Sequence, residues 1–330
     1  MKTVIVTAVG SFSGPAVIRC LKEQGWRVVG TEINPPELIA VSAETDEFVV
    51  LPRCDAGQSY IDAMKELIRK EGASAVLPLT DAELDVLNEV RGELLPAVLW
   101  VSPEDAVRRS RDKLLSRAAA EKAGARVIPT MLLSEVPVKD RVGALLDAPG
   151  LPLILKPKDG RSSQGLYRVR TEEELLKALR EIRDSGREER FLVQPLIEGR
   201  VVTADVVRFP DGSCTAAPRE EYVRTHNGAG LSVHVFRDRG LEAQCAAVAR
   251  ELGILGCVNF EFIYTEKGEY YFMECNPRFS GGVGFTTAAG DDVIRNHLSC
   301  FGAAAEGPKR GDGPADCWIA RKYVEVITKS

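Results

Sequence analysis

The chain has 330 residues, of which 45% are hydrophobic and 28% are charged, and its formal net charge is −5. This composition is ordinary for a globular protein of two or three packed units, and the negative charge, without a stripe rich in lysine or arginine, argues against nucleic acid as a partner. No run of about 18 apolar residues is present, so no membrane span is expected, and no signal peptide is predicted.

Residues 2–101 alternate between apolar strands and amphipathic helices. The pattern predicts strands at 2–9, 27–33, 48–52, 75–80 and 98–101, with helices at 15–24, 59–70 and 81–91. Strands and helices that alternate with short loops form a parallel sheet covered on both faces. The first part of the chain is therefore predicted to be Rossmann-like.

The opening strand, turn and helix raise the question of a dinucleotide site. Gly10 and Gly14 occupy the first turn, and Glu32 ends the second strand, where an acid binds ribose in such sites. The spacing is Gly-x-x-x-Gly, which departs from the dinucleotide pattern, so a nicotinamide cofactor stays an alternative. Thr80 and Asp81 lie at the carboxyl edge of the sheet and are substrate candidates, although a helix N-cap explains Asp81 equally well.

A lysine ends a buried strand in the middle of the chain. Residues 153–156 read LILK, and burying the Lys156 ammonium requires an anionic partner. The following residues, 157–165, contain small side chains and two glycines, which predicts a lid over phosphate; a plain hairpin loop is the alternative. Thr171 and Glu174 form a capping box that starts a helix at 171–185.

The remaining chain predicts a second set of strands. Strands are expected at 191–197, 201–209, 213–218 and 317–327, and helices at 240–252 and 291–301. The eight cysteines form no Cys-x-x-Cys pair and fit reduced thiols of a cytoplasmic protein. The three histidines have no metal-site spacing and are interpreted as structural.

Residues 258–282 predict a β-hairpin that turns at Lys267–Gly268. In that register Glu261 lies opposite Glu274, and Asn259 lies opposite Asn276. Because side chains two apart share a face of a strand, both carboxylates and both carboxamides face the same way. Tyr264 is then paired with Tyr271, and the side chains expected in the core are Phe260, Phe262, Met273 and Cys275.

Two facing carboxylates repel each other unless a cation lies between them. Glu261, Glu274 and Asn276 offer an all-oxygen set that suits Mg²⁺, with Mn²⁺ as an alternative ion. A solvated hairpin face with lysine or arginine counterions is the other interpretation. Arg278 favours the metal, because a guanidinium next to a metal pair is suited to phosphoryl transfer.

The stretch from Glu274 to Arg278, Glu-Cys-Asn-Pro-Arg, together with Glu261, resembles the closing signature of the ATP-grasp ligases. The continuation Phe279-Ser-Gly-Gly282 resembles the branch of the carbamoyl phosphate synthetase large subunit. The resemblance covers nearly the whole chain. It implies an α/β fold with a Rossmann-like domain at 1–110, a small lid lobe at 111–198 and a C-terminal lobe with the metal and substrate site at 199–330.

The resemblance also implies a set of nucleotide-binding residues. Lys113 and Lys156 correspond to lysines that contact ATP phosphates, and residues 160–165, including Gly165, correspond to the glycine-rich flap. The hinge that reads adenine corresponds to Gln194, Leu196 and Ile197. Where the family often has an acid that binds ribose, this chain has Val201, so Glu198 or another residue is expected to supply that contact.

The activity implied is ATP-dependent activation of a small carboxylate, an amino acid or related acid, as an acyl phosphate that an amine then attacks. Arg278 and Lys156 are the expected catalytic residues, and Arg219, Arg278 and Gly282 the expected substrate contacts; a surface role for Arg219 is the alternative. A homodimer is expected from the resemblance. Other functions left open are a non-catalytic ATP-binding sensor and a small-molecule kinase.

Overall fold

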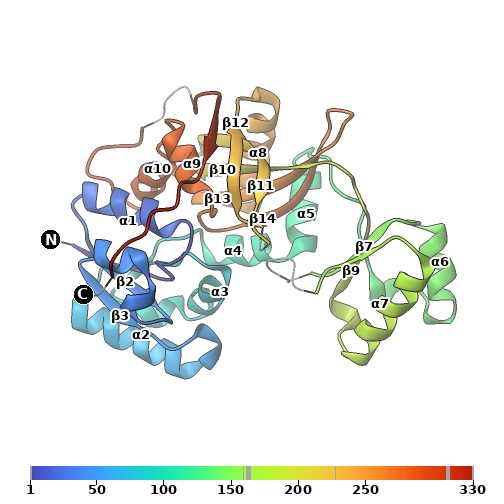
Figure 1. Cartoon of the computed structure of the whole chain (residues 1–330), viewed down its shortest axis with the longest axis horizontal. Helices are drawn as coiled ribbons and strands as arrows, with labels where there is room; N and C mark the ends of the chain where they lie inside the picture. Colours follow the sequence, from blue (N-terminus) through green and yellow to red (C-terminus); the bar gives the residue numbers. More distant parts are fainter. Residues whose placement is uncertain (1, 159, 161–164, 227, 310–312, 329–330) are drawn as a thin grey trace.

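The computed structural model describes residues 2–158, 160, 165–226, 228–309 and 313–328. It has three lobes (Figure 1). The N-terminal lobe contains a parallel five-stranded sheet, as the alternation predicted, in the order β3-β2-β1-β4-β5. Its strands are β1 (Thr3–Val6), β2 (Arg27–Glu32), β3 (Glu47–Val50), β4 (Ala75–Leu77) and β5 (Val98–Leu99).

Helices cover both faces of this sheet. Helix α1 (Gly14–Glu23) packs on one face, and α2 (Gln58–Glu71) and α3 (Asp81–Glu89) pack on the other. The start of α1 lies so close to the preceding turn that a Cβ on Gly14 would be 1.9 Å from the carbonyl oxygen of Val9. The glycine at this position therefore serves close packing of helix against strand.

The lid lobe is an antiparallel four-stranded sheet in the order β6-β9-β7-β8. Its strands are β6 (Met131–Leu132), β7 (Leu153–Pro157), β8 (Tyr167–Val169) and β9 (Phe191–Pro195), and its helices are α6 (Arg141–Asp147) and α7 (Glu172–Asp184). The predicted capping box at Thr171 and Glu174 is confirmed at the start of α7. One face of the sheet packs on these helices in a core that belongs to the lid alone.

The C-terminal lobe is built on a six-stranded antiparallel sheet in the order β14-β13-β10-β11-β12-β15. The strands are β10 (Arg200–Arg208), β11 (Cys214–Arg224), β12 (Gly230–Val235), β13 (Gly256–Tyr264), β14 (Tyr270–Asn276) and β15 (Cys317–Ala320). The helices around it are α4 (Glu104–Arg111), α5 (Lys113–Lys122), α8 (Arg239–Leu252), α9 (Val283–Ala288) and α10 (Val293–Cys300).

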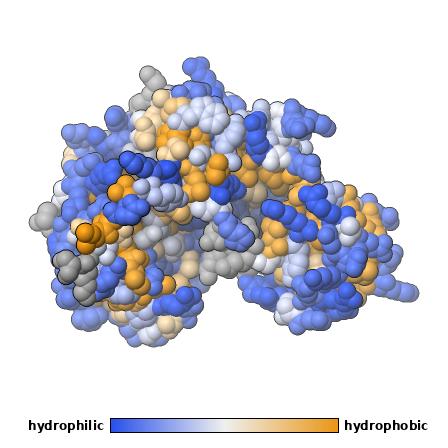
Figure 2. All heavy atoms as spheres, in the orientation of Figure 1, coloured by the Kyte–Doolittle hydropathy of each residue, from blue (hydrophilic) through white to orange (hydrophobic). Residues whose placement is uncertain are grey.

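The N-terminal and C-terminal lobes share a continuous hydrophobic core. Residues of β1 and α1 pack in one cluster with Phe279 and with residues of α10. The lid stands apart, and Figure 2 shows the surface notched between it and the rest of the molecule. Among the described residues, no helix combines the length and apolarity that a bilayer span requires.

Several sequence expectations for the C-terminal lobe were wrong in extent. Strand β11 continues to Arg224 rather than ending at Pro218, and β12 was not predicted, because the glycines around 228–230 resemble a loop. Strand β15 ends at Ala320, since residues beyond it run over the N-terminal lobe (Figure 1). Helix α5 belongs to the range 111–198 that the resemblance implies for the lid lobe, and it packs on α8 and β14.

His297 on α10 is buried in the C-terminal lobe and generates a prediction about stability. Its Nδ1 accepts a hydrogen bond of 2.8 Å from the backbone N–H of Cys257, and its ring lies against Phe279 and Phe301. Burial lowers the pKa of His297 from 6.5 to about 3. Between these values the unfolded chain binds a proton that the folded protein excludes, so stability falls as the pH falls through this range.

We expect acid to remove about 1.4 kcal/mol of unfolding free energy per pH unit through this residue. His297→Asn keeps an acceptor near Nδ1 and removes the proton site, so its urea-unfolding free energy should fall less steeply with acid than that of the parent. Identical slopes for the parent and His297→Asn would contradict the assignment.

Candidate active site

The predicted pairing of the two carboxylates is confirmed. Glu261 on β13 lies opposite Glu274 on β14, and Asn259 lies opposite Asn276. The side-chain amide of Asn276 donates weak hydrogen bonds to both carboxylates, at 3.4 Å to Glu261 and 3.3 Å to Glu274. Three oxygen-bearing side chains therefore converge at the inner end of the hairpin.

The register toward the turn differs from the prediction. A β-bulge after Glu261 brings Phe262 opposite Phe272 and Tyr264 opposite Tyr270, rather than Tyr271. Met273 is the extra residue of the bulge, so it is half-buried, and Phe272 takes its expected place in the core. Bulges commonly occur next to active sites because they re-aim side chains, and this one lies beside the Glu261–Glu274 pair.

The two carboxylates have opposite pKa shifts. Burial, and then the charge of Glu274, raises the pKa of Glu261 to about 7. Burial also acts to raise the pKa of Glu274, but Lys113 and Lys156 outweigh it, and the pKa is lowered. The positive charges of the surrounding protein therefore stabilise the ionised form of Glu274 more than that of Glu261.

The two lysines approach Glu274 from different elements. Lys113, at the start of α5, lies 3.3 Å from Glu274 and donates to the carbonyl of Gly160 at 2.6 Å. Lys156, at the end of β7 in the lid, is buried, and its pKa is lowered to about 8 by burial despite the nearby carboxylates. The structure therefore brings together both predicted phosphate lysines and the predicted metal pair.

The nucleotide-binding residues expected in the lid sheet lie on the face of that sheet opposite its helices. Lys156 and Ile154 alternate with the core residues of β7, and Gln194 of β9 lies opposite Ile154. The Gln194 side chain donates to Thr130 at 2.8 Å, and the N–H of Leu196 donates to the Pro152 carbonyl at 2.9 Å.

The other residues expected to bind the nucleotide lie in the segments that follow β9 and β7. Leu196 and Ile197 are half-buried at the hinge, and Glu198 is exposed beside them. Residues 161–164 of the predicted flap lie outside the described residues. Gly160 and Gly165 are described, and Gly165 is exposed with a φ of 71°.

Arg278 is held by the N-terminal lobe. Its guanidinium donates to the Asp81 carboxylate at 2.7 Å and to the Phe279 carbonyl at 3.1 Å. Thr80, not Asp81, is the N-cap of α3, so the capping interpretation of Asp81 was wrong. Burial acts to raise the pKa of Asp81, but Arg278 and Arg111 outweigh it and lower that pKa.

Arg219 lies deeper than expected. Its side chain is 1% exposed, and it donates to Asp205 at 2.7 Å and to Ser280 at 2.9 Å. A Cβ on Gly282 would lie 2.6 Å from the guanidinium nitrogens. Arg219 therefore supports the Ser280–Gly282 turn from beneath, with its charge already balanced by Asp205.

Sequence reasoning missed two arginines. Arg224 is anchored by its Nε, 3.0 Å from Glu221 and 2.8 Å from the Gly228 carbonyl, while its Nη2 lies 3.8 Å from Glu261. Arg321 is held between the rings of Phe12 and Phe285.

Arg321 also ties two loops together. It donates to the carbonyl of Gly230 at 3.0 Å and to that of Gly281. Neither arginine belongs to a local motif, because each reaches the site through contacts distant in sequence.

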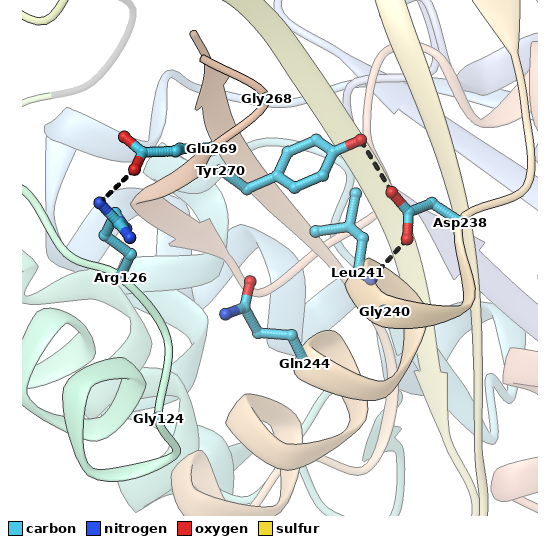
Figure 3. A pocket seen from close by; sticks show the side chains of 9 residues that line it. All are labelled: Gly124, Arg126, Asp238, Gly240, Leu241, Gln244, Gly268, Glu269 and Tyr270. Carbon is cyan, nitrogen blue, oxygen red and sulfur yellow. Dashed lines mark hydrogen bonds and ion pairs between the residues drawn. The ribbon is translucent and has the colours of Figure 1, made fainter.

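A pocket of about 440 Å³ lies elsewhere, between the turn of the hairpin and the start of α8 (Figure 3). Its charged groups are already paired: Arg126 lies 2.7 Å from Glu269, and Asp238 accepts a hydrogen bond of 3.1 Å from the Tyr270 hydroxyl. It opens at the opposite end of β14 from Glu274, and we assign no chemistry to it.

Two stretches of the chain match known families. Residues 4–97 match the family described as PylC-like, N-terminal domain, and residues 187–312 match the family described as ATP-grasp in the biosynthetic pathway with Ter operon.

Curated relatives match over most of the chain. Biotin carboxylase of Haemophilus influenzae is 25% identical over 285 residues, covering 79% of this chain and 62% of that protein. Carbamoyl phosphate synthase large chain of Rubrobacter xylanophilus is 25% identical over 292 residues, covering 82% of this chain and 26% of that protein. The chain thus spans less than two thirds of the length of these relatives.

Solved structures share the fold. A biotin carboxylase complex from Campylobacter jejuni superimposes with a TM-score of 0.78 at 17% identity, covering 96% of this chain and 74% of that one. N5-carboxyaminoimidazole synthetase from Staphylococcus aureus gives a TM-score of 0.71 at 14% identity, covering 93% and 79%. With the matching families, these structures confirm the predicted fold: the chain has the ATP-grasp fold, with a stretch that matches a PylC-like N-terminal domain ahead of a stretch that matches an ATP-grasp domain.

Proposed function

We propose that the protein is a Mg-ATP-dependent ligase that activates a small carboxylate as an acyl phosphate for attack by an amine. The observation that carries the proposal is the convergence of Glu261 and Glu274 with Lys113, Lys156 and Arg278. The name of one relative, biotin carboxylase, refers to a carboxylation reaction. A related solved structure, the biotin carboxylase domain of a 2-oxoglutarate carboxylase, is a complex with MgADP and bicarbonate.

The site fits a hard divalent cation. Among the described residues no group of three or more His, Cys, Asp or Glu side chains could hold a metal ion. Glu261, Glu274 and the Asn276 oxygen would fill only part of an octahedral shell and would leave positions for phosphate oxygens and water. That arrangement is typical of Mg²⁺ bound with a nucleotide, and Mn²⁺ prefers similar ligands. When bound, the ion would neutralise charge on the transferring phosphoryl group.

The chain's own residues would contribute positioning and positive charge. A substrate carboxylate oxygen forms a bond to the γ-phosphorus as the bond to ADP breaks, and ADP leaves with the electron pair. The amine nitrogen then bonds to the acyl carbon, inorganic phosphate leaves, and the amine loses a proton. Lys113 and Lys156 offset phosphate charge, Arg278 stabilises the transferring group, and the lid limits access of water.

The substrate carboxylate is assigned to Arg278 and Arg224. Arg224 is fixed through its Nε and directs its Nη2 toward the carboxylate pair. Arg219 lacks that freedom because its guanidinium is buried on Asp205 and Ser280. Guanidinium groups recognise carboxylates with paired hydrogen bonds, so Arg278 of the signature stretch and Arg224 at the end of β11 suit an acid substrate.

The carboxylate pair is tested by two neighbouring substitutions. Glu274→Gln should lower the rate of ADP release from Mg-ATP and the acid by about 100-fold or more. The substitution removes a ligand of the ion that would balance charge at the transferring phosphate. Cys275→Ser should leave kcat nearly unchanged, since Cys275 lies in the core on the opposite face of the strand. Equal losses in both variants, with both folded by circular dichroism, would contradict the metal assignment.

Kinetic and stability measurements should distinguish the roles of Arg224 and Arg219, the two arginines of β11. Arg224→Gln should raise KM for the acid and leave KM for ATP and the unfolding temperature nearly unchanged. Arg219→Gln should lower the unfolding free energy by about 3–5 kcal/mol, because it leaves the buried Asp205 charge unpaired. A stable Arg219→Gln variant with a raised KM for the acid would reverse these roles.

A further inference from the structure

The N-terminal sheet has a topological switch point. The chain proceeds from β1 to β2 to β3 on one side and then crosses to β4 on the other side of β1. Open α/β sheets bind ligands in the crevice at the carboxyl ends of the strands beside such a point. In this protein Thr7 follows β1 there, and Thr80 follows β4 and begins α3.

A carboxylate is built into this crevice. Glu83 on α3 accepts hydrogen bonds from the hydroxyls of Thr7 at 2.8 Å and Thr80 at 2.7 Å, and a longer one of 3.4 Å from Tyr60. The Thr80 hydroxyl donates to this carboxylate and makes no cap bond to the helix backbone. Three hydroxyls from three different elements therefore fix the orientation of Glu83.

The carboxylate of Glu83 has no counterion among the residues that the structure describes. In the described part of the chain, no lysine or arginine forms an ion pair with it, and the nearby Glu32 adds negative charge. Burial raises the pKa of Glu83, while its hydroxyl donors act in the opposite direction. Asp81, two residues earlier, differs because Arg278 and Arg111 neutralise it.

A second polar group on this side of the sheet has no partner in the described part of the chain. Thr31 on β2 is 1% exposed, and its hydroxyl has no hydrogen-bond partner among the described residues. Strand alternation places it on the face of Val29, which shares a core cluster with Tyr60 and Ile5. Thr7 continues the face of Ile5, so the unpaired hydroxyl lies on the same side of the sheet as Glu83.

We propose that Glu83 binds the ammonium group of the substrate, and that the substrate is an amino acid whose carboxylate reaches Arg278. This inference rests on the proposed function and names its substrate class. An ammonium ion offers three donors and a positive charge, which a fixed carboxylate without a counterion accepts. Asp81, which binds Arg278, lies two residues before Glu83 at the start of α3, so the proposed carboxylate and ammonium contacts both lie at the carboxyl edge of the N-terminal sheet.

The test measures binding and does not need turnover. The full-length protein, with Mg²⁺ and β,γ-methylene-ATP, is titrated calorimetrically with the twenty amino acids, ornithine, β-alanine and 4-aminobutyrate. Each probe that binds is repeated as its N-acetyl derivative, which keeps the carboxylate and removes the positive charge. We expect at least one amino acid to bind. Its acetylated form should bind at least about tenfold more weakly, and a tenfold change corresponds to about 1.4 kcal/mol of binding free energy.

Two variants locate the effect. Glu83→Gln keeps acceptor and shape but removes the charge, and should weaken the same amino acid at least tenfold. Glu89→Gln, on the exposed side of α3, should bind as the parent does. Unchanged affinity in Glu83→Gln, equal binding of acetylated probes, or no binding by any amino acid would overturn the inference.

The outcome separates this inference from the proposed function. Amino-acid binding that depends on Glu83, without ADP release from Mg-ATP, would retain the ammonium site and contradict the ligase. Turnover of an acid that carries no amino group, at a rate unaffected by Glu83→Gln, would support the ligase and contradict the ammonium site.

Discussion

The electrostatic repulsion between Glu261 and Glu274 is the constraint on which the site depends. Two carboxylates face each other on neighbouring strands and are held at the end of a bulged hairpin. Such a pair is costly without compensation, and the protein compensates it from every direction: Lys113 from α5, Lys156 from the lid, and the Asn276 amide between them. A cation bound with a nucleotide would complete this balance, which is why the arrangement suits phosphoryl transfer.

The distribution of cores suggests how the lobes share the work. The N-terminal and C-terminal lobes form one hydrophobic cluster, and the Asp81–Arg278 pair joins them at the site. The lid has its own core and contributes Lys156 and the inner sheet face. A rigid platform for metal and substrate, facing a separately packed lid, is an arrangement that allows a nucleotide to enter and then be enclosed.

The sequence predicted the parallel N-terminal sheet and the Glu261–Glu274 pairing because both follow from local periodicity. The prediction was wrong where the backbone departs from the two-residue period of a strand. The bulge at Met273 shifts the register of the outer half of the hairpin, and β12 was not predicted because glycines precede it. The roles of Arg219 and Arg224 could not be separated, since burial on Asp205 or proximity to Glu261 depends on contacts between distant strands. Glu83 was missed for the same reason, because its partners lie on three elements.

Trapping of the activated acid tests the central claim most directly. The purified protein is mixed with Mg-ATP, hydroxylamine and pooled amino acids and other small carboxylates, and hydroxamate and ADP are quantified together. Because hydroxylamine intercepts an acyl phosphate whatever the natural amine is, the account predicts hydroxamate in amounts matching ADP, and splitting the pool identifies the acid. ADP without hydroxamate would indicate a phosphorylated product that is released, and tight Mg-ATP binding without ADP would contradict catalysis altogether.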